Sequence, residues 1–372
     1  MSKLILRLWH WVPQNIRTRI SPFLGALASR YPSDKRSGIH PEVIALRCLG
    51  QGINALEQKK ALVVALSADY DNDRRGASGE FFSYGLVLEK MGFTVRQFDP
   101  YAWARKCGKK TASEGLYEVV GLFNPSTILY FHYLDIVDHE IWKKISAIPE
   151  IKTAIFYYDD DWRHGETRQL EQNFNAILST WPGAQTARPD YTGQVIITQF
   201  GINPDYHRDL HLARDIDVSF IGQKYGNRER YISYLMNKGI HVEVFGWGWE
   251  KSRRLNMFEM VEILNRSKIT INFSEQGKGA YLTIKGRVFE ATACGACLLT
   301  QSSAGIERYF TPDKEIICFR TEEELHERVL YLLKNDAIRK EIAVAGQERT
   351  LKEHTNEKRL QMILDRLANP GS

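Results

Sequence analysis

The stretch Lys285-Gly286-Arg287-Val288-Phe289-Glu290, running on into Ala293-Cys294-Gly295, is the most informative part of the chain. It lies between two apolar runs typical of buried strands, 269–273 and 297–300, and it predicts the start of a helix. A helix start offers backbone N–H groups and the positive end of the helix dipole to an anion. Lys285 and Arg287 add positive charge there, and Gly286 lets a ligand come close to the backbone. The stretch therefore predicts a site for an anionic group such as a phosphate.

Outward from this stretch, apolar strands alternate with amphipathic helices in both directions. Continuous apolar strands separated by helices indicate parallel sheets that are covered on both faces. The alternation pauses at Gly201-Ile202-Asn203-Pro204 and then restarts, which predicts an α/β fold with two Rossmann-like domains facing a cleft. The expected strands are 61–66, 94–98, 127–132, 153–158, 176–178 and 195–197, then 217–222, 241–246, 269–273 and 297–300.

The domain organisation that follows has four parts. A basic helical extension precedes two Rossmann-like domains, and a last helix follows them. The long helix expected over 336–368 contains this last part. The boundaries are 1–50, 51–199, 200–345 and 346–372.

The charge is concentrated at the N-terminus. Residues 1–36 carry seven basic side chains against Asp34 alone, a net charge of +6, whereas the whole chain has +5, so the remainder is near −1. A uniformly basic nucleic-acid binder would look different, and we expect no nucleic-acid partner. Trp9 and Trp11 beside basic residues suit the surface of a membrane, so we consider peripheral membrane contact through residues 1–36, with a self-packed helix as the alternative.

The five cysteines do not form a disulfide framework in a chain of 372 residues, which favours a cytoplasmic protein, at the inner face of the membrane if the N-terminal segment binds lipid. Cys294-Gly295-Ala296-Cys297 has the C-x-x-C spacing of a redox motif, but it lies among small residues typical of close packing. No apolar run approaches the roughly 18 residues that a membrane-spanning helix requires.

The C-terminal half resembles the sugar-nucleotide domain of GT-B glycosyltransferases, most closely the CgeB-like (spore-coat type) group with its group-1-type C-terminal domain. The resemblance covers roughly residues 195–345 and rests on four motifs in order. They are Val218-Ser219-Phe220-Ile221-Gly222 with Tyr225-Gly226-Asn227-Arg228-Glu229, Val244-Phe245-Gly246-Trp247-Gly248-Trp249, Ile271-Asn272-Phe273-Ser274, and Lys285 to Gly295.

The resemblance implies a nucleotide-sugar donor in this half, with a UDP-sugar favoured and neither a further cofactor nor a metal required. Lys285 and Arg287 would neutralise the diphosphate, and Glu290 would accept hydrogen bonds from the ribose hydroxyls, as an acidic residue does in dinucleotide folds. Trp247 or Trp249 could stack on the base. The remaining expected donor-binding residues are Gly222, Arg228, Gly246, Ser274 and Gly295.

One position departs from the pattern of many GT-B enzymes, which carry two glutamates separated by seven residues. Leu282 stands eight residues before Glu290, where the first glutamate would be. Glu275 is a displaced candidate in a longer loop.

The resemblance implies that 200–345 is the nucleotide-sugar domain and 51–199 the acceptor domain, and that the last helix crosses back to the acceptor domain. His132 and Asp160 follow strands that end at the cleft, and either side chain could take a proton from an acceptor hydroxyl. The loop 69–76 offers further carboxylates, with turn formation as its alternative role, and helix capping is the alternative for Asp159-Asp160-Asp161.

These observations favour an enzyme that transfers a sugar from a nucleotide sugar to a hydroxyl group of a glycan or lipid-linked acceptor, in cell-envelope, spore or surface glycan synthesis. Three alternatives stay open. The first is a nucleotide-sugar epimerase of the same fold. The second is a GT-A-type transferase that holds a metal ion with Asp159–Asp161. The third is a catalytically silent scaffold at the membrane.

Overall fold

The computed structural model describes residues 59–68, 77–158, 160–163, 165, 168–250, 252–275 and 282–369. The expectations for the extension 1–50, including membrane contact through residues 1–36, lie outside the described residues. The same holds for the loop 69–76 and for Asp159, so these remain predictions from the sequence.

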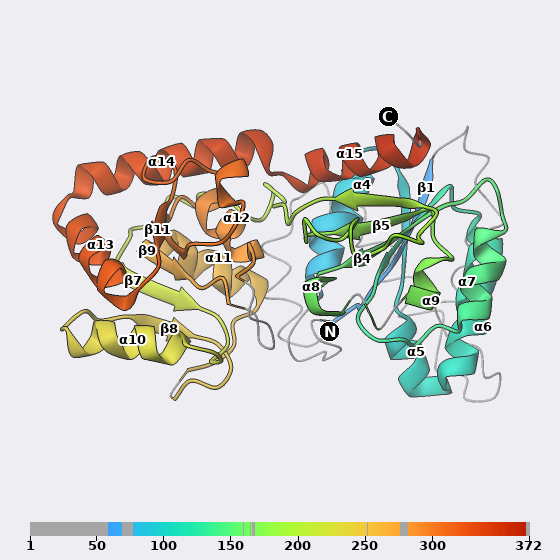
Figure 1. The fold of residues 1–372 in the computed structure, drawn as a ribbon, viewed down its shortest axis with the longest axis horizontal. Coiled ribbons are helices and arrows are strands. Elements are labelled where there is room, and N and C mark those ends of the chain that lie inside the picture. Colours follow the sequence, from blue (N-terminus) through green and yellow to red (C-terminus); the bar gives the residue numbers. More distant parts are fainter. Residues whose placement is uncertain are drawn as a thin grey trace, which may run out of the picture. The chain divides into compact units, whose positions relative to one another are not determined.

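The first sheet has six parallel strands in the order β2-β1-β3-β4-β5-β6 (Figure 1). Strand β1 pairs with β2 on one side and with β3 on the other, so the chain builds the sheet outward in both directions. The strands are β1 (Lys60–Val64), β2 (Thr94–Phe98), β3 (Thr127–Phe131), β4 (Lys152–Tyr157), β5 (Ala176–Ser179) and β6 (Gln194–Ile197).

The helices between these strands cover both faces of the first sheet. The helix after β1 contains a π-helical turn, η3 (Phe81–Gly85), which continues directly into α4 (Leu86–Lys90). Asp99 caps the next helix, because its side chain accepts hydrogen bonds from the amides of Tyr101 and Ala102. The other helices are α5 (Pro100–Cys107), α6 (Lys109–Phe123), α7 (His139–Ser146), α8 (Asp160–Arg163) and α9 (Arg168–Glu171).

The second sheet has five parallel strands in the order β11-β10-β9-β7-β8. Its strands are β7 (Ile216–Ile221), β8 (Glu243–Phe245), β9 (Ser267–Asn272), β10 (Cys297–Gln301) and β11 (Ile317–Phe319). One apolar cluster joins the sheet to α10 (Arg228–Asn237) and α13 (Glu322–Lys334), and another joins it to α11 (Met257–Arg266) and α12 (Gly286–Ala293). The predicted α/β fold with two parallel sheets, each flanked by helices, is confirmed.

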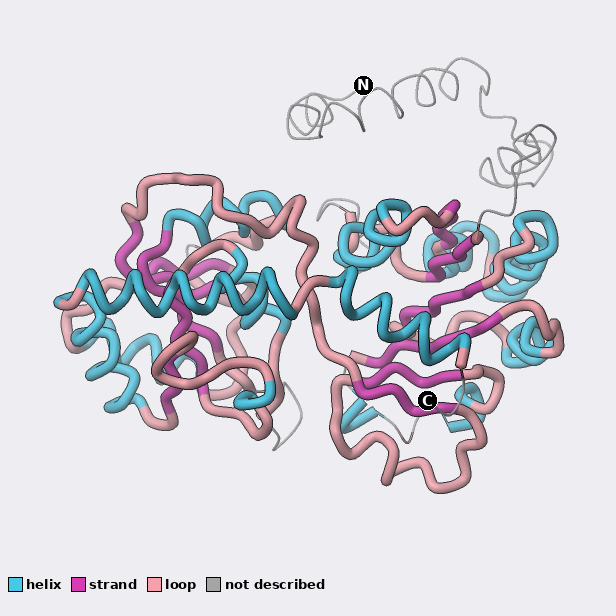
Figure 2. Tube along the Cα trace, turned by 90° about the horizontal axis from the view of Figure 1, so that it is seen from above, coloured by secondary structure: helices cyan, strands magenta, loops and turns pink. Residues whose placement is uncertain are grey.

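The C-terminal segment connects the two sheets. Helix α14 (Asp336–Glu353) packs against α12 and β10, whereas α15 (Asn356–Ala368) packs against η3 and α4. Figure 2 shows these two long helices following each other from one sheet to the other. Leu360, Ile363 and Leu367 of α15 are buried in the core of the first sheet. The single helix expected over 336–368 is wrong in one respect, because the chain leaves helical geometry at His354 and Thr355 and starts a new helix with the Thr355 side chain as its cap.

None of the helices in the described ranges combines the length and apolar character that a bilayer crossing requires.

Candidate active site

Two adjacent pockets lie at the carboxyl ends of the strands. The larger, of about 540 Å³, is called here the tyrosine pocket because Tyr84, Tyr133, Tyr157 and Tyr158 line it. The smaller, of about 390 Å³, is called the arginine pocket because Arg228, Arg254 and Arg287 line it. Gly79, Ser83, Arg287 and Glu290 border both pockets. Parallel α/β sheets bind ligands at this end of their strands.

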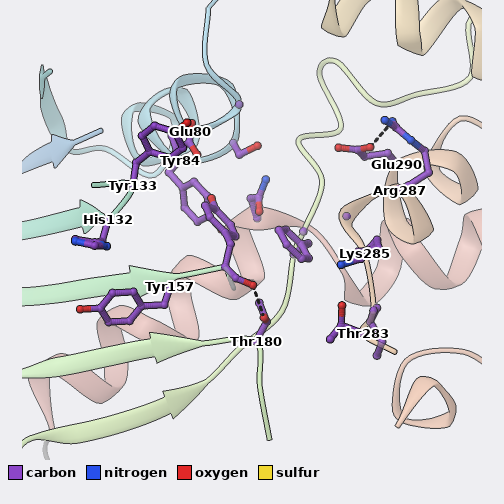
Figure 3. A pocket seen from close by; sticks show the side chains of 18 of the residues that line it. Glu80, Tyr84, His132, Tyr133, Tyr157, Thr180, Thr283, Lys285, Arg287 and Glu290 are labelled. Atoms are coloured by element: carbon purple, nitrogen blue, oxygen red, sulfur yellow. Dashed lines mark hydrogen bonds and ion pairs between the residues drawn. The ribbon is translucent and has the colours of Figure 1, made fainter. Parts of the chain in front are cut away.

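The start of α12 lies where the two pockets meet. Lys285 is the N-cap residue, in extended geometry and without a capping hydrogen bond from its side chain, and it lines the tyrosine pocket. Arg287 Nη1 donates to Glu290 Oε2 at 2.5 Å, and Figure 3 shows this pair at the pocket wall. The structure therefore brings together Lys285, Arg287 and Glu290, the three residues of the opening motif with predicted ligand contacts.

Arg228 places a buried positive charge in the arginine pocket. Its guanidinium stacks on the ring of Tyr225, and the distance from the guanidinium carbon to the ring centroid is 3.7 Å. Its Nη1 donates to the carbonyl of Gln223 at 2.9 Å and its Nη2 to the Tyr225 hydroxyl at 2.5 Å. Burial lowers the pKa of Arg228. A guanidinium held by neutral oxygens keeps its charge available to an anion.

Gly222 and Gly246 allow two backbone segments of the arginine pocket to come into close contact. Gly246 has φ of +142°, and a Cβ at this position would lie 2.0 Å from the carbonyl oxygen of Gly222. The Gly222 N–H donates to the carbonyl of Phe245, and the Gly222 carbonyl accepts from the indole N–H of Trp249. Trp249 thus packs inside the fold, while Trp247 lines the pocket with 69% of its surface exposed. Of the two tryptophans, Trp247 lines the arginine pocket and Trp249 does not.

Two residues near the motifs, Ser274 and Glu275, have supporting roles. Ser274 is buried, and its hydroxyl donates to the Gln301 carbonyl at 2.6 Å, which ties the end of β9 to the end of β10. The Glu275 carboxylate accepts from the backbone and side chain of Asn227, at 2.8 and 3.0 Å, and so holds the loop that carries Arg228. Neither residue lines the two pockets.

Gly295 is placed differently from the expectation. It follows the C-terminal end of α12 with φ of +71°, and it lines a separate cavity with Arg214 and Gln347. An eight-residue helix is about 12 Å long, so Gly295 lies at the opposite end of α12 from Lys285. Its positive φ ends the helix, which is the role glycine commonly has at this position.

His132 faces the tyrosine pocket from the end of β3. It is 7% exposed, and neither ring nitrogen has a hydrogen-bond partner among the described residues. Burial, with the charge of Arg163 as a smaller cause, lowers its pKa to about 4. The ring is therefore neutral at pH 7 and can accept a hydrogen bond from a hydroxyl group.

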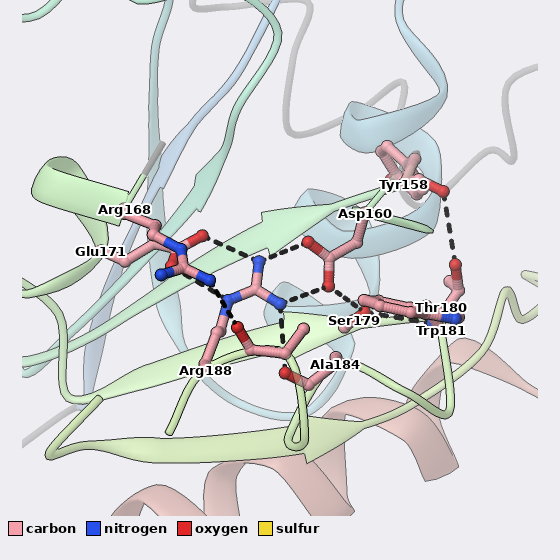
Figure 4. Close-up of polar contacts among 10 residues, drawn as sticks. Tyr158, Asp160, Arg168, Glu171, Ser179, Thr180, Trp181, Ala184 and Arg188 are labelled. Atoms are coloured by element: carbon pink, nitrogen blue, oxygen red, sulfur yellow. Dashed lines mark hydrogen bonds and ion pairs between the residues drawn. The ribbon is translucent and has the colours of Figure 1, made fainter. Parts of the chain in front are cut away.

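Asp160 lies in a buried ion cluster and not at the pocket wall (Figure 4). Arg188 binds both oxygens of Asp160 and both oxygens of Glu171, and the Ser179 hydroxyl donates to Asp160 at 2.6 Å. Both carboxylates and the guanidinium are at most 2% exposed. A carboxylate bound in this way has a structural role, and the geometry does not favour Asp160 as a base for an acceptor.

Sequence reasoning missed two parts of the site. The first is the helix start after β1 with its π-helical turn. Ser83 and Tyr84 of the turn, and Gly79 and Glu80 just before it, line the tyrosine pocket, and Gly79 and Ser83 also border the arginine pocket. Such turns frequently occur at functional sites, but no sequence signal separates them from an ordinary helix. The second is His207, which is 3% exposed, lines the arginine pocket and has a pKa lowered by burial.

Cys294 and Cys297 are buried free thiols. Burial raises the pKa of each to about 12. Because the thiolate is the reactive form, this environment does not suit a redox motif. Within the described ranges, no group of three or more histidine, cysteine or acidic side chains is arranged to hold a metal ion.

Comparison with known proteins agrees with this geometry. Residues 228–365 match the family model described as glycosyl transferase-like. No curated protein matches the chain significantly.

Solved structures match over most of the chain. Sucrose-phosphate synthase from Thermosynechococcus elongatus superposes with a TM-score of 0.61 at 12% identity, over 85% of this chain and 100% of the other. HepE from Anabaena, in complex with UDP and glucose, superposes with a TM-score of 0.57 at 10% identity, over 84% of this chain and 100% of the other. A glycosyltransferase from Rickettsia africae superposes with a TM-score of 0.57 at 9% identity, over 85% of this chain and 100% of the other.

The chain has the GT-B architecture, and its segment from residue 228 to residue 365 is similar to the glycosyl transferase-like family. The alternative GT-A reading is wrong, because the fold consists of two separate parallel sheets of the GT-B type.

Proposed function

We propose that this protein transfers a sugar from a UDP-sugar to a hydroxyl group of a glycan or lipid-linked acceptor, with the nucleotide in the arginine pocket and the acceptor in the tyrosine pocket. The observation that carries the proposal is the meeting of the two pockets at the start of α12, beside Arg287 and Glu290. The donor sugar, joined to the diphosphate, would then reach from one pocket into the other. Binding of UDP by HepE, which has the same fold, supports uridine as the nucleoside.

The donor is held by charge and by stacking. Arg228, Lys285 and Arg287 would bind the diphosphate, and Glu290 would accept hydrogen bonds from the ribose hydroxyls. Trp247 offers an exposed ring face for the base. Cations that are already in place stabilise negative charge as it develops on the leaving diphosphate.

The reaction forms one bond and breaks one. The acceptor oxygen bonds to the anomeric carbon of the sugar, and the bond from that carbon to the diphosphate oxygen breaks, so the nucleoside diphosphate leaves with the electron pair. The acceptor hydroxyl gives up its proton as this bond forms. His132, which is neutral and faces the tyrosine pocket, would take this proton and release it to water.

A thermal-shift series with UDP-, GDP-, dTDP- and CMP-sugars tests the donor assignment. A ligand that binds the native state raises the free energy of unfolding by about 2.7 kcal/mol at a hundredfold excess over Kd. The unfolding midpoint rises with it. We expect the largest rise with UDP-sugars and its loss in Glu290→Ala. The matched control is Glu262→Ala, which removes an exposed carboxylate on α11 and should leave the rise intact.

The same samples separate transfer from the alternatives. Incubation with labelled UDP-sugar and no acceptor should give slow hydrolysis, whereas an epimerase would return an epimerised donor. A rise with another nucleotide would move the assignment from uridine to that base. No rise with any nucleotide would contradict the proposed donor site as a whole.

A further inference from the structure

Asn356 stands at the point where the chain passes between the two sheets. It is the first residue of α15, next to the capping residue Thr355. Its backbone N–H donates to the carbonyl of Ile202 at 2.8 Å, and the Ile202 N–H donates to His354 at 3.0 Å. These bonds join the segment that enters the second sheet to the segment that leaves it. The backbone of Asn356 therefore has a structural role, and its side chain takes no part in these bonds.

The side-chain amide of Asn356 is buried and unpaired. The residue is 0% exposed, and among the described residues neither Oδ1 nor Nδ2 has a hydrogen-bond partner. The side chain nevertheless lines the tyrosine pocket. Gly201 leaves room for it, because a Cβ at residue 201 would lie 2.6 Å from Asn356 Oδ1.

An unpaired buried amide is unfavourable for folding. Most buried polar groups in native structures have a partner, so one that lacks a partner at the wall of a pocket points to a ligand. His132 lines the same pocket and has the same property. An apolar side chain of similar size would suit the fold better at position 356.

We propose that Asn356 is a recognition residue for the acceptor, and that the acceptor group is a carbohydrate that presents two neighbouring hydroxyls to this amide. The inference rests on the proposed function, since it takes the tyrosine pocket as the acceptor site. A carboxamide offers one donor and one acceptor side by side. Two adjacent sugar hydroxyls match it, because one can accept from Nδ2 while the other donates to Oδ1.

The rest of the pocket fits a sugar. Tyr158 and Phe200 line it and stack with ring centroids 5.2 Å apart and planes 2° apart, which provides a flat apolar surface for the face of a sugar ring. Glu80, Thr283 and Lys285 add polar groups around this surface. A pocket of aromatic rings with a few placed polar groups orients a small polar ligand, whereas a lipid chain requires a continuous apolar groove.

The substitution Asn356→Leu separates recognition from folding. Leucine has nearly the same size and removes no hydrogen bond within the chain, so we expect the unfolding midpoint to stay the same or to rise. Loss of two hydrogen bonds to the ligand should raise KM for the acceptor by about tenfold or more, with KM for the UDP-sugar unchanged. The control is Asn237→Leu at the exposed end of α10, which should change neither KM.

The acceptor assay uses methyl α-glucoside, methyl β-glucoside and methyl α-mannoside with 1-octanol as the lipid-like comparison. Transfer to a glycoside, with the acceptor KM raised in Asn356→Leu, supports the inference. Two results overturn it. One is an unchanged acceptor KM in that variant, and the other is transfer to octanol but to none of the glycosides. If the wild-type protein binds no UDP-sugar, the proposed function itself fails, and the thermal-shift series reports this separately.

Discussion

At the scale of single residues, the contact between Arg287 and Glu290 occupies two groups that a nucleotide would need. The side chains are 19% and 26% exposed, so the pair is shielded from water without being sealed. A bound nucleotide sugar would exchange this ion pair for two contacts with the ligand, one from the guanidinium to the diphosphate and one from the carboxylate to the ribose. If the proposed donor site is right, the pair keeps both side chains in place before the donor binds.

Two histidines make stability depend on pH. Burial lowers the pKa of His132 and of His354 to about 4, well below the usual value near 6.5. The folded chain holds both rings neutral, while the unfolded chain protonates them below pH 6.5. The contribution of the two neutral rings to the free energy of unfolding is complete above pH 6.5. As the pH falls from 6.5 to 4, each ring loses about 1–3 kcal/mol of this contribution.

This dependence can be measured by urea unfolding at pH 7.0 and pH 4.5. We expect His132→Phe, which cannot be protonated, to lose a smaller part of its unfolding free energy between the two pH values than the wild-type chain. The control is His139→Gln, because His139 pairs with Asp135 on the surface. Equal losses in His132→Phe and the wild type would contradict the assignment.

At the scale of elements, the ion cluster of Asp160, Arg188 and Glu171 joins α8 and α9 to the loop after β5. Removing one partner from a buried ion pair leaves an uncompensated charge and costs about 3–5 kcal/mol. We therefore expect Arg188→Met to lower the free energy of unfolding by this amount in urea titration. Arg266→Met, which breaks the more exposed pair with Asp215, should leave the free energy of unfolding nearly unchanged.

A triple variant distinguishes charge from packing in this cluster. Arg188→Met with Asp160→Asn and Glu171→Gln removes all three charges, so it should recover part of the stability lost in Arg188→Met. No recovery would mean that the cost comes from lost packing of the arginine side chain.

The sequence predicts elements well where the apolar period is strong and less well elsewhere. The buried strands and the helix after Lys285 follow from their patterns. The helices α5 and α6 were missed, although Asp99-Pro100 is a recognisable helix start, because the polar run 105–114 hides their apolar face. Strand β11 was missed because three residues at the edge of a sheet are too short to show a period.

The same physical limits apply to the site. Lys285, Arg287 and Glu290 are local to one helix start, so their neighbourhood could be read from the chain. Asp160 could not be assigned in this way, because its partner Arg188 lies 28 residues away and only the fold brings them together. Asn356 is still more remote, since it reaches the tyrosine pocket from the other end of the chain.

At the scale of the whole molecule, α15 should contribute to the stability of the first sheet. Leu360 is fully buried in the same apolar cluster as Ala61 and Leu129. We expect Leu360→Ala to lower the free energy of unfolding by about 2–5 kcal/mol. Hydrogen exchange should become faster in β1 and β3 of that variant. Leu351→Ala, at an exposed position on α14, should leave the exchange rates of both strands unchanged.

The return of α15 to the first sheet also affects how the protein is made. The ribosome completes residues 60–197 well before it reaches Leu360, Ile363 and Leu367, which at about 5–20 residues per second is a delay on the order of ten to thirty seconds. During that time the first sheet exists as a nascent chain whose apolar face still lacks its covering helix. A nascent chain stalled shortly before residue 356 would therefore be a better substrate for chaperones than the released protein.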